Sequence, residues 1–210
     1  GLAFESSTNQ NPWYQFTAID RDGYIIQTGT MFDMMVAAND PREVIYRGDS
    51  ASGYFYLPFY GAATAEVPFI TEHEVLFILA EAQLASGDAS AARASLEAAI
   101  QSNMDHVGVD AAASAAYIAA LSATTDLELI MNEKYVAMYT HVEAWTDWRR
   151  TGYPTISAPA DANLSAIPRR MPYPEGEYLY NAANMPMPLS ATPDEKFGAS
   201  STYRLWWDAN

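Results

Sequence analysis

The sequence predicts a mostly α-helical fold in which antiparallel helical hairpins carry long, irregular loops. Residues 71–141 place apolar residues at helical spacing between capping residues and glycines. Between residues 154 and 193, by contrast, eight prolines exclude long helices. We therefore expect a single region with three parts: a loop-rich segment (1–70), a helical segment (71–152) and a proline-rich packed coil (153–210).

The first part offers few helical signals. Residues 1–29 are rich in Ser, Asn, Gln, Asp and Gly, which favours a loop carrying aromatic side chains over a helix. Residues 30–39 space their methionines as a short helix does, and the run ends before Pro41 because the residue preceding proline avoids helical backbone angles. Glycines and prolines then divide residues 43–69 into short aromatic pieces, which predicts irregular chain with room for one small hairpin.

The helical part opens with the sequence TEHE, a capping box in which Thr71 accepts a backbone N–H and Glu74 reaches back. Gly87 ends this helix, and Asp88 caps the next one, which Gly108 closes. The first helix has an apolar face made of Val75, Ile78, Leu79 and Ala82. The second has an inner stripe made of Ala92, Leu96, Ala99, Ile100 and Met104.

These two helices resemble a tetratricopeptide repeat, with Ala80 and Ala92 where the helices touch and Gly87 at the turn. A second pair is expected over residues 110–123 and 125–141. Its spacing departs from a strict repeat of about 34 residues, so we predict a degenerate second copy.

Composition excludes several classes of protein. The formal net charge is −15 and the pI is near 4.3, so the chain would repel nucleic acid and anionic membranes. No apolar run approaches the length of about 20 residues that a membrane span needs, which predicts no membrane insertion by this segment. The absence of cysteine excludes disulfides and thiolate metal sites. The first residues do not have the pattern of a signal peptide.

One stretch, LELIMNEKYVAMYTHVEAWTDWRRTGYP (127–154), resembles the C-terminal helix and turn of the SusD/RagB family of Bacteroidota outer-membrane nutrient-binding lipoproteins. Matching pieces in the family's order are NDPR (39–42), FILAEAQL (77–84), IPRRMPYPEGEYLYN (167–181) and WWD (206–208). The resemblance implies part of a SusD-like superhelix. It further implies that this chain is the C-terminal portion of a longer, surface-exposed lipoprotein whose anchor lies in the missing N-terminal part.

The same resemblance implies a function at the cell outer membrane. The protein would bind an oligosaccharide or polysaccharide, without catalysis or cofactor, and deliver it to a SusC-like TonB-dependent transporter. Two alternatives stay open. One is a SusD/RagB-type protein that binds peptide nutrients, and the other is a tetratricopeptide-like scaffold for protein interaction.

Carbohydrate binding directs attention to aromatic side chains on polar loops, because the C–H face of a sugar packs on an aromatic ring. Trp13 and Tyr14 meet this description, and Asn11 beside them is a candidate for reading sugar hydroxyls. Tyr54 and Tyr56 are further candidate ligand residues. The alternative for Trp13 is that it fills the core. For the two later tyrosines, a core or interface role is the competing interpretation.

A second cluster comprises Trp145, Trp148, Arg149 and Arg150. Helical spacing places Trp145, Trp148 and Arg149 on one side, where guanidinium groups can stack on indole rings or pair with Glu143 and Asp147. We interpret the cluster as a structural corner that locks this helix to the loop behind it, with a ligand role as the alternative.

Signals for catalysis or metal binding are weak. Carboxylates are abundant, yet none of their spacings indicates the opposed pair that a glycosidase needs. His73, His106 and His141 are far apart in the sequence, which argues against a transition-metal site, and His73 is expected to be a solvated residue of a first helical turn. Residues 20–23 (DRDG) resemble part of a calcium loop but lack the later glutamate.

Overall fold

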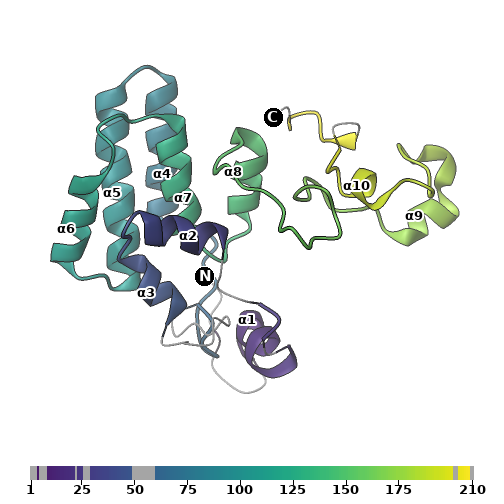
Figure 1. Ribbon diagram of the computed structural model, residues 1–210, viewed down its shortest axis with the longest axis horizontal. Helices are drawn as coiled ribbons and strands as arrows, with labels where there is room; N and C mark the ends of the chain where they lie inside the picture. Colours follow the sequence, from purple (N-terminus) through teal and green to yellow (C-terminus); the bar gives the residue numbers. More distant parts are fainter. Residues whose placement is uncertain are drawn as a thin grey trace. The chain divides into compact units, whose positions relative to one another are not determined.

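A computed structural model describes residues 4, 9–21, 23–25, 29–48, 60–200 and 203–208. The chain divides into two compact units, residues 1–144 and 145–210, and each is considered by itself. The described residues form helices and no strand, which confirms the mostly α-helical prediction (Figure 1). No helix in these ranges is long and apolar enough to cross a bilayer.

The centre of the first unit is an antiparallel hairpin of α4 (Glu72–Ala85) and α5 (Ala89–Val107), which lie side by side in Figure 1. Its ends follow from local chemistry. Thr71 accepts the Glu74 N–H at 3.2 Å, and Asp88 accepts the Ala91 N–H at 2.9 Å. Gly108 adopts the left-handed conformation that ends α5, with φ of 83°. The two predicted helices are confirmed, as are the caps by Thr71 and Asp88. The return bond from the Glu74 side chain, which a capping box would add, is not among the bonds at the start of α4.

The core of this unit is the predicted inner stripe of α5, whose Ala92, Leu96, Ala99, Ile100 and Met104 are fully buried. Burying one Leu or Ile side chain contributes about 1.5–3 kcal/mol, so this stripe is a main source of stability. From α4, the buried apolar residues are Phe77 and Ala80. Small side chains at Ala80 and Ala92 allow the two backbones to approach closely.

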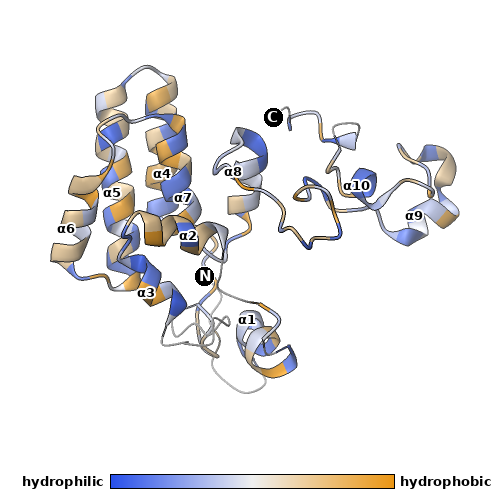
Figure 2. Ribbon diagram, in the orientation of Figure 1, coloured by the Kyte–Doolittle hydropathy of each residue, from blue (hydrophilic) through white to orange (hydrophobic). Residues whose placement is uncertain are grey.

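The apolar face that the sequence predicts on α4 faces away from this core. Val75, Ile78 and Leu79 are 49%, 49% and 43% exposed, although Figure 2 shows hydrophobic residues along both helices of the hairpin. The reason is that α5 and α7 together contact the side of α4 that carries Phe77 and Ala80. The exposed residues are left on the remaining side.

Helices α6 (Ala111–Ala120) and α7 (Leu127–Ala137) stand where the sequence predicts the second pair, but both are shorter than predicted and their backbones do not pack against each other as a hairpin. Asp110 caps α6 by accepting the Ala112 N–H at 2.9 Å, and Asp126 caps α7 by accepting the Leu129 N–H at 2.8 Å. α6 contacts α5, and α7 contacts α4 and α5, so the bundle extends the first hairpin.

Two short helices precede the hairpin, α2 (Thr30–Ala37) and α3 (Arg42–Arg47). The sequence predicts α2 but not α3, because Asp40 and Pro41 look like the end of a helix. They also start the next one. The Asp40 carboxylate accepts the backbone N–H of Arg42 at 2.9 Å and its guanidinium Nε at 2.9 Å.

The expectation of a loop over residues 1–29 is wrong for part of its length. Residues Pro12–Tyr14 form α1, and Gln15–Asp20 continue it as the π-helix η1. Asn11 caps this helix and Pro12 stands at its first position, where the missing proline N–H carries no penalty. The Asn-Pro pair was therefore a readable start signal within a polar segment.

The second unit contains most of α8 (Glu143–Thr151), which begins at the end of the first unit. It continues with three short helices, α9 (Glu175–Tyr180), η2 (Ala182–Asn184) and α10 (Pro193–Lys196). None is longer than six residues, as the proline density predicts. Tyr178, Met187 and Ala191 form a small core against which Met185 and Tyr203 pack.

Candidate functional site

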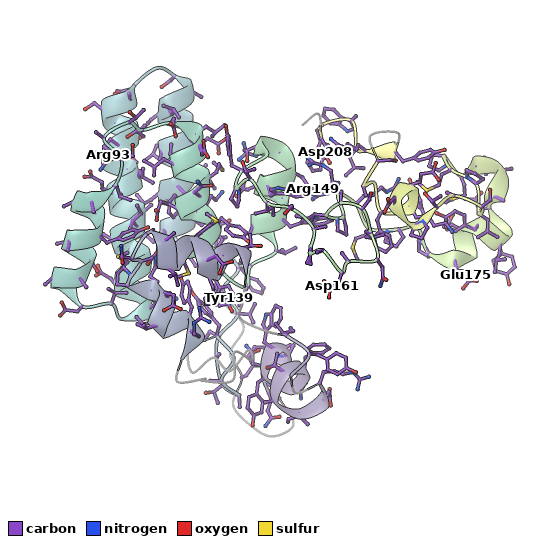
Figure 3. All side chains as sticks on the ribbon, in the orientation of Figure 1. Arg93, Tyr139, Arg149, Asp161, Glu175 and Asp208 are labelled. Atoms are coloured by element: carbon purple, nitrogen blue, oxygen red, sulfur yellow. The ribbon has the colours of Figure 1, made fainter. Side chains whose placement is uncertain are left out.

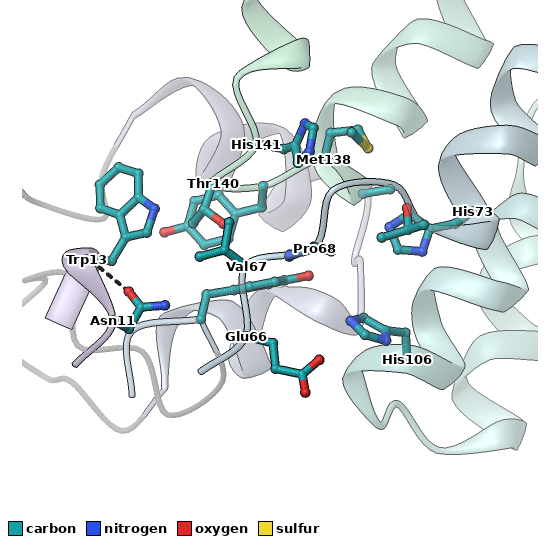
Figure 4. Close-up of a pocket in the computed structure, with 14 residues that line it drawn as sticks. Asn11, Trp13, Glu66, Val67, Pro68, His73, His106, Met138, Thr140 and His141 are labelled. Atoms are coloured by element: carbon teal, nitrogen blue, oxygen red, sulfur yellow. Dashed lines mark hydrogen bonds between the residues drawn. The ribbon is translucent and has the colours of Figure 1, made fainter. Parts of the chain in front are cut away.

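Two adjoining cavities in the first unit share Trp13 and the turn at residues 138–141 after α7. The first cavity is small, with a volume of about 40 Å³, and is also lined by Glu66, His73 and His106 (Figure 4). The second has a volume of about 340 Å³ and is also lined by Thr30, Met31, Phe32 and Ala144. A predicted ligand residue, Trp13, therefore lines both a narrow hollow and a larger one, and the larger one is of a size that accepts small organic groups.

Trp13 is held by the backbone and by Asn11. The Asn11 Oδ1 accepts the Trp13 N–H at 2.7 Å, which Figure 4 marks with a dashed line, and the Asn11 Nδ2 donates to the Ala65 carbonyl at 2.8 Å. The Thr17 hydroxyl donates to the Trp13 carbonyl at 2.6 Å. Asn11 is 1% exposed, and through these two bonds its buried amide holds the start of α1, and with it Trp13, in this conformation.

Asn11, also a predicted ligand residue, lines the first cavity, where its amide is hydrogen-bonded to Ala65 and Trp13. The other predicted aromatic ligand residues do not line either cavity or lie outside the described residues. Tyr14 is partly exposed and lines neither cavity. Tyr54 and Tyr56 lie outside the described residues. Trp13 is thus the predicted aromatic residue that the structure places at a cavity, and the roles of the other three remain predictions.

An aromatic cluster supports the turn after α7. The Tyr139 ring stacks on Tyr46 at 4.9 Å between centroids and meets Phe32 and Tyr60 edge-on, each at 5.9 Å. Each such pair contributes about 0.5–1.5 kcal/mol beyond its burial. Tyr139, labelled in Figure 3, therefore fixes the backbone on which Thr140 and His141 stand.

Three histidines meet at the first cavity although they are far apart in the sequence. The His73 and His106 rings lie 5.7 Å apart, and His141 lines the same cavity. The prediction that His73 is solvated is wrong, because it is 4% exposed. Burial lowers the pKa of His73 to about 4, with smaller contributions from His106, Arg42 and His141, so this imidazole is neutral at pH 7.

The charge of the two linings is low. No Lys or Arg lines either cavity among the described residues, and Glu66 is the acidic residue of the first one. Within the same part of the chain, no group of three or more His, Asp or Glu side chains is arranged to hold a metal ion. The chemistry available is therefore aromatic contact and hydrogen bonding by hydroxyl, imidazole and amide groups.

The predicted corner lies in the second unit. The Arg149 guanidinium lies 3.7 Å from the Trp145 ring centroid and 4.8 Å from that of Trp207, and its Nη1 donates to the Arg169 carbonyl at 3.1 Å. The Trp145 indole N–H donates to the Pro168 carbonyl at 2.8 Å. Trp148 is buried, and Arg150 is exposed and pairs with Asp147 at 2.9 Å.

Arg169 extends this cluster. Its Nε lies 2.9 and 2.8 Å from the two Asp208 carboxylate oxygens, its Nη2 donates to the Arg149 carbonyl at 2.8 Å, and its guanidinium lies over Trp148 at 4.5 Å. Figure 3 labels Arg149 and Asp208. All these contacts join parts of one unit, so they tie α8 to the following loop and to the end of the described chain.

Comparison with known proteins gives one family. The model of a family described as starch-binding and associating with the outer membrane matches residues 2–174, which is most of the chain. No curated protein gives a significant match.

Proposed function

Because the chain belongs to the SusD-like family, whose description is starch binding in association with the outer membrane, we propose that it captures uncharged oligosaccharide or polysaccharide at Trp13. The bound glycan would pass, chemically unchanged, to a SusC-like TonB-dependent transporter. We propose in addition that a lipid anchor holds the protein at the cell surface.

One observation carries the choice of site. Trp13 lines both of two adjoining cavities, whose linings also include threonine hydroxyls and histidine imidazoles. A sugar ring needs both kinds of contact, an aromatic surface for its C–H face and hydrogen-bonding groups for its hydroxyls. The fixed backbone around Asn11 lowers the entropy lost when the ring is engaged.

The choice of an uncharged glycan follows from the linings. A uronate or sulfate group would find no Lys or Arg in the described walls, and it would meet Glu66 and an overall charge of −15. Desolvating an anion without a partner costs several kcal/mol on an order-of-magnitude scale. Neutral polysaccharides avoid that cost.

Affinity electrophoresis tests both parts of the proposal. The wild type would be run in gels containing starch, dextran, xylan or galactomannan and in gels containing alginate or polygalacturonate. We expect retardation by at least one neutral polymer, loss of it in Trp13→Ala, and retention of it in the control Trp206→Ala, whose ring is 93% exposed in the second unit.

Three results would count against the proposal. Retardation by the acidic polymers alone would contradict the uncharged class. Retardation that survives Trp13→Ala but not Trp206→Ala would move the site to the second unit. No retardation by any polymer would exclude glycan capture by this chain.

The exposed apolar face of α4 favours one second candidate, a scaffold that binds another protein. Val75, Ile78 and Leu79 form a stripe of the kind that partner helices cover. Replacing all three with Gln would abolish such an interaction and leave glycan retardation intact. If retardation is absent in the wild type, this candidate gains weight.

A further inference from the structure

Thr140 has a backbone conformation that its side chain disfavours. Its φ is 68°, in the left-handed region that costs little for glycine and most for a β-branched residue. The turns after α4 and α5 follow the rule, because Gly87 and Gly108 hold φ of 86° and 83° there. In the turn after α7, the residue with positive φ is a threonine.

Thr30, at the start of α2, shares this feature with φ of 24°. Among the described residues, the third with positive φ that is not a glycine is Asn39, and asparagine tolerates such angles well. The two β-branched outliers therefore stand apart from the rest of the backbone.

Both threonines line the second cavity, next to Trp13. Asn39, in contrast, is exposed and lines neither cavity. The hydroxyls of Thr30 and Thr140 donate to no other described residue and accept from none, so two hydrogen-bonding groups at one cavity are uncommitted in the part of the chain that the structure describes.

We propose that Thr30 and Thr140 are specificity-determining residues of the second cavity, which hold two hydroxyls toward the hydroxyl groups of a sugar ring seated beside Trp13. This inference rests on the proposed glycan binding. It adds the residues that read the sugar's polar edge, whereas Trp13 supplies the apolar contact.

Strain at a site persists when the surrounding structure determines it. Here Tyr139, immediately before Thr140, is fixed by its contacts with Tyr46 and Phe32, and the His141 N–H after it donates to the Met138 carbonyl at 2.9 Å. A glycine would satisfy the same backbone with less strain but would present no hydroxyl.

Two substitutions at Thr140 separate the hydroxyl from the strain. Thr140→Val keeps the β-branched shape and removes the hydroxyl. We expect its Kd for the neutral polysaccharide that retards the wild type to rise about threefold to tenfold, with an unchanged melting temperature. Thr140→Gly removes both the hydroxyl and the backbone strain. Its Kd should therefore rise about as much as that of Thr140→Val, while its melting temperature rises by about 2–4 °C.

Thr140→Ser retains the hydroxyl and should bind within about twofold of the wild type. Thr30→Val should weaken binding as Thr140→Val does. Asn39→Gly is the matched control, since it relaxes a positive φ away from both cavities and should leave the Kd unchanged. Affinity electrophoresis at graded polymer concentration gives the Kd, and calorimetry gives the melting temperature.

The outcomes separate this inference from the proposed function. Suppose that the wild type and Asn39→Gly bind glycan and that Trp13→Ala does not. If Thr30→Val and Thr140→Val then bind as tightly as the wild type, the assignment of the threonines is wrong, while the proposed glycan capture at Trp13 stands. If Thr140→Gly binds as tightly as the wild type, the hydroxyl has no role. If the wild type binds none of the polymers, both proposals fail together.

Discussion

The Nη2 of Arg42 lies 2.8 Å from the Oε2 of Glu133, and the Arg42 side chain is fully buried. The same guanidinium contacts Asp40 at 2.6 Å and the Asn103 Oδ1 at 3.0 Å, while the Tyr117 hydroxyl donates to the other Glu133 oxygen at 2.7 Å. One buried cation thus joins the turn before α3 to α5 and α7.

We predict that Glu133→Gln lowers the free energy of unfolding by about 3–5 kcal/mol, because it leaves the buried Arg42 without one of its two carboxylates. The matched control is Glu97→Gln on the partly exposed Arg93–Glu97 pair, which should cost less than about 1 kcal/mol. Urea denaturation of both variants measures the difference. Equal losses of stability in the two variants would mean that burial does not strengthen the Arg42–Glu133 ion pair.

His73 predicts a pH dependence of stability. The unfolded chain protonates this imidazole near its usual pKa of 6.5, whereas burial lowers the folded-state pKa to about 4. The unfolded state therefore binds more protons in this window. The stability that the neutral His73 contributes is present above pH 6.5 and is lost as the pH falls from about 6.5 to about 4.

The expected loss is about 1–3 kcal/mol after allowance for solvent screening. Urea midpoints of the wild type and His73→Gln at pH 7 and pH 4.5 measure it, because the variant cannot take up this proton and should lose less. Carboxylates contribute to both curves and cancel in the comparison. Parallel losses in the two proteins would show that His73 does not titrate as described.

The corner in the second unit predicts unequal effects for its two adjacent arginines. Arg149→Leu removes two indole contacts and a hydrogen bond to the Arg169 carbonyl, so it should lower stability by about 2–4 kcal/mol. Arg150→Leu removes an exposed pair with Asp147 and should cost less than about 1 kcal/mol.

Four of the five tryptophans lie in the second unit, so intrinsic fluorescence reports its unfolding directly. Both arginine variants should retain glycan retardation if the corner is structural. Loss of retardation in a folded Arg149→Leu protein would support the ligand role instead.

Asn11 predicts an indirect effect on binding. Asn11→Ala removes the cap on Trp13 and the bond to the Ala65 carbonyl, so it should lower stability by about 1–2 kcal/mol. Asn11→Asp keeps the cap but loses the donor to the Ala65 carbonyl, so its stability should lie between those of the wild type and Asn11→Ala. If Asn11→Ala leaves both the melting temperature and the glycan affinity unchanged, other contacts hold α1 and Trp13 in place.

The sequence was informative where structure depends on local chemistry. Thr71, Asp88, Asp110 and Asp126 cap helices as oxygen-bearing side chains do, and Gly108 ends α5, so the starts of these helices and the end of α5 could be read from the sequence. The ends of α6 and α7, which no glycine marks, lie three and four residues before the predicted ones. The inner stripe of α5 was equally readable from its spacing.

Tertiary contacts decided what could not be predicted. The apolar face of α4 looks like a core face, but which side is buried depends on where α5 and α7 pack. The burial of Arg42 requires Glu133, which is 91 residues away in the chain. A partner so far away in the chain leaves no pattern in the sequence around Arg42 that would predict its burial.

The candidate site shows the same division. The polar segment carrying Trp13 could be selected from the sequence because aromatic rings among polar residues suit sugars, although it is helical and not the expected loop. The meeting of His73 and His106 could have been inferred, since an antiparallel hairpin puts the start of α4 beside the end of α5. The backbone strain at Thr140 could not, because its φ depends on the aromatic cluster around Tyr139.

The most direct measurement of the central claim is ¹⁹F NMR of protein labelled with 5-fluorotryptophan. Five resonances are expected, and Trp13→Phe assigns that of Trp13. An oligosaccharide of the retarding polymer should shift the Trp13 resonance in a saturable way and leave those of Trp145, Trp148, Trp206 and Trp207 in place. A saturable shift confined to the second-unit tryptophans would contradict glycan capture at Trp13.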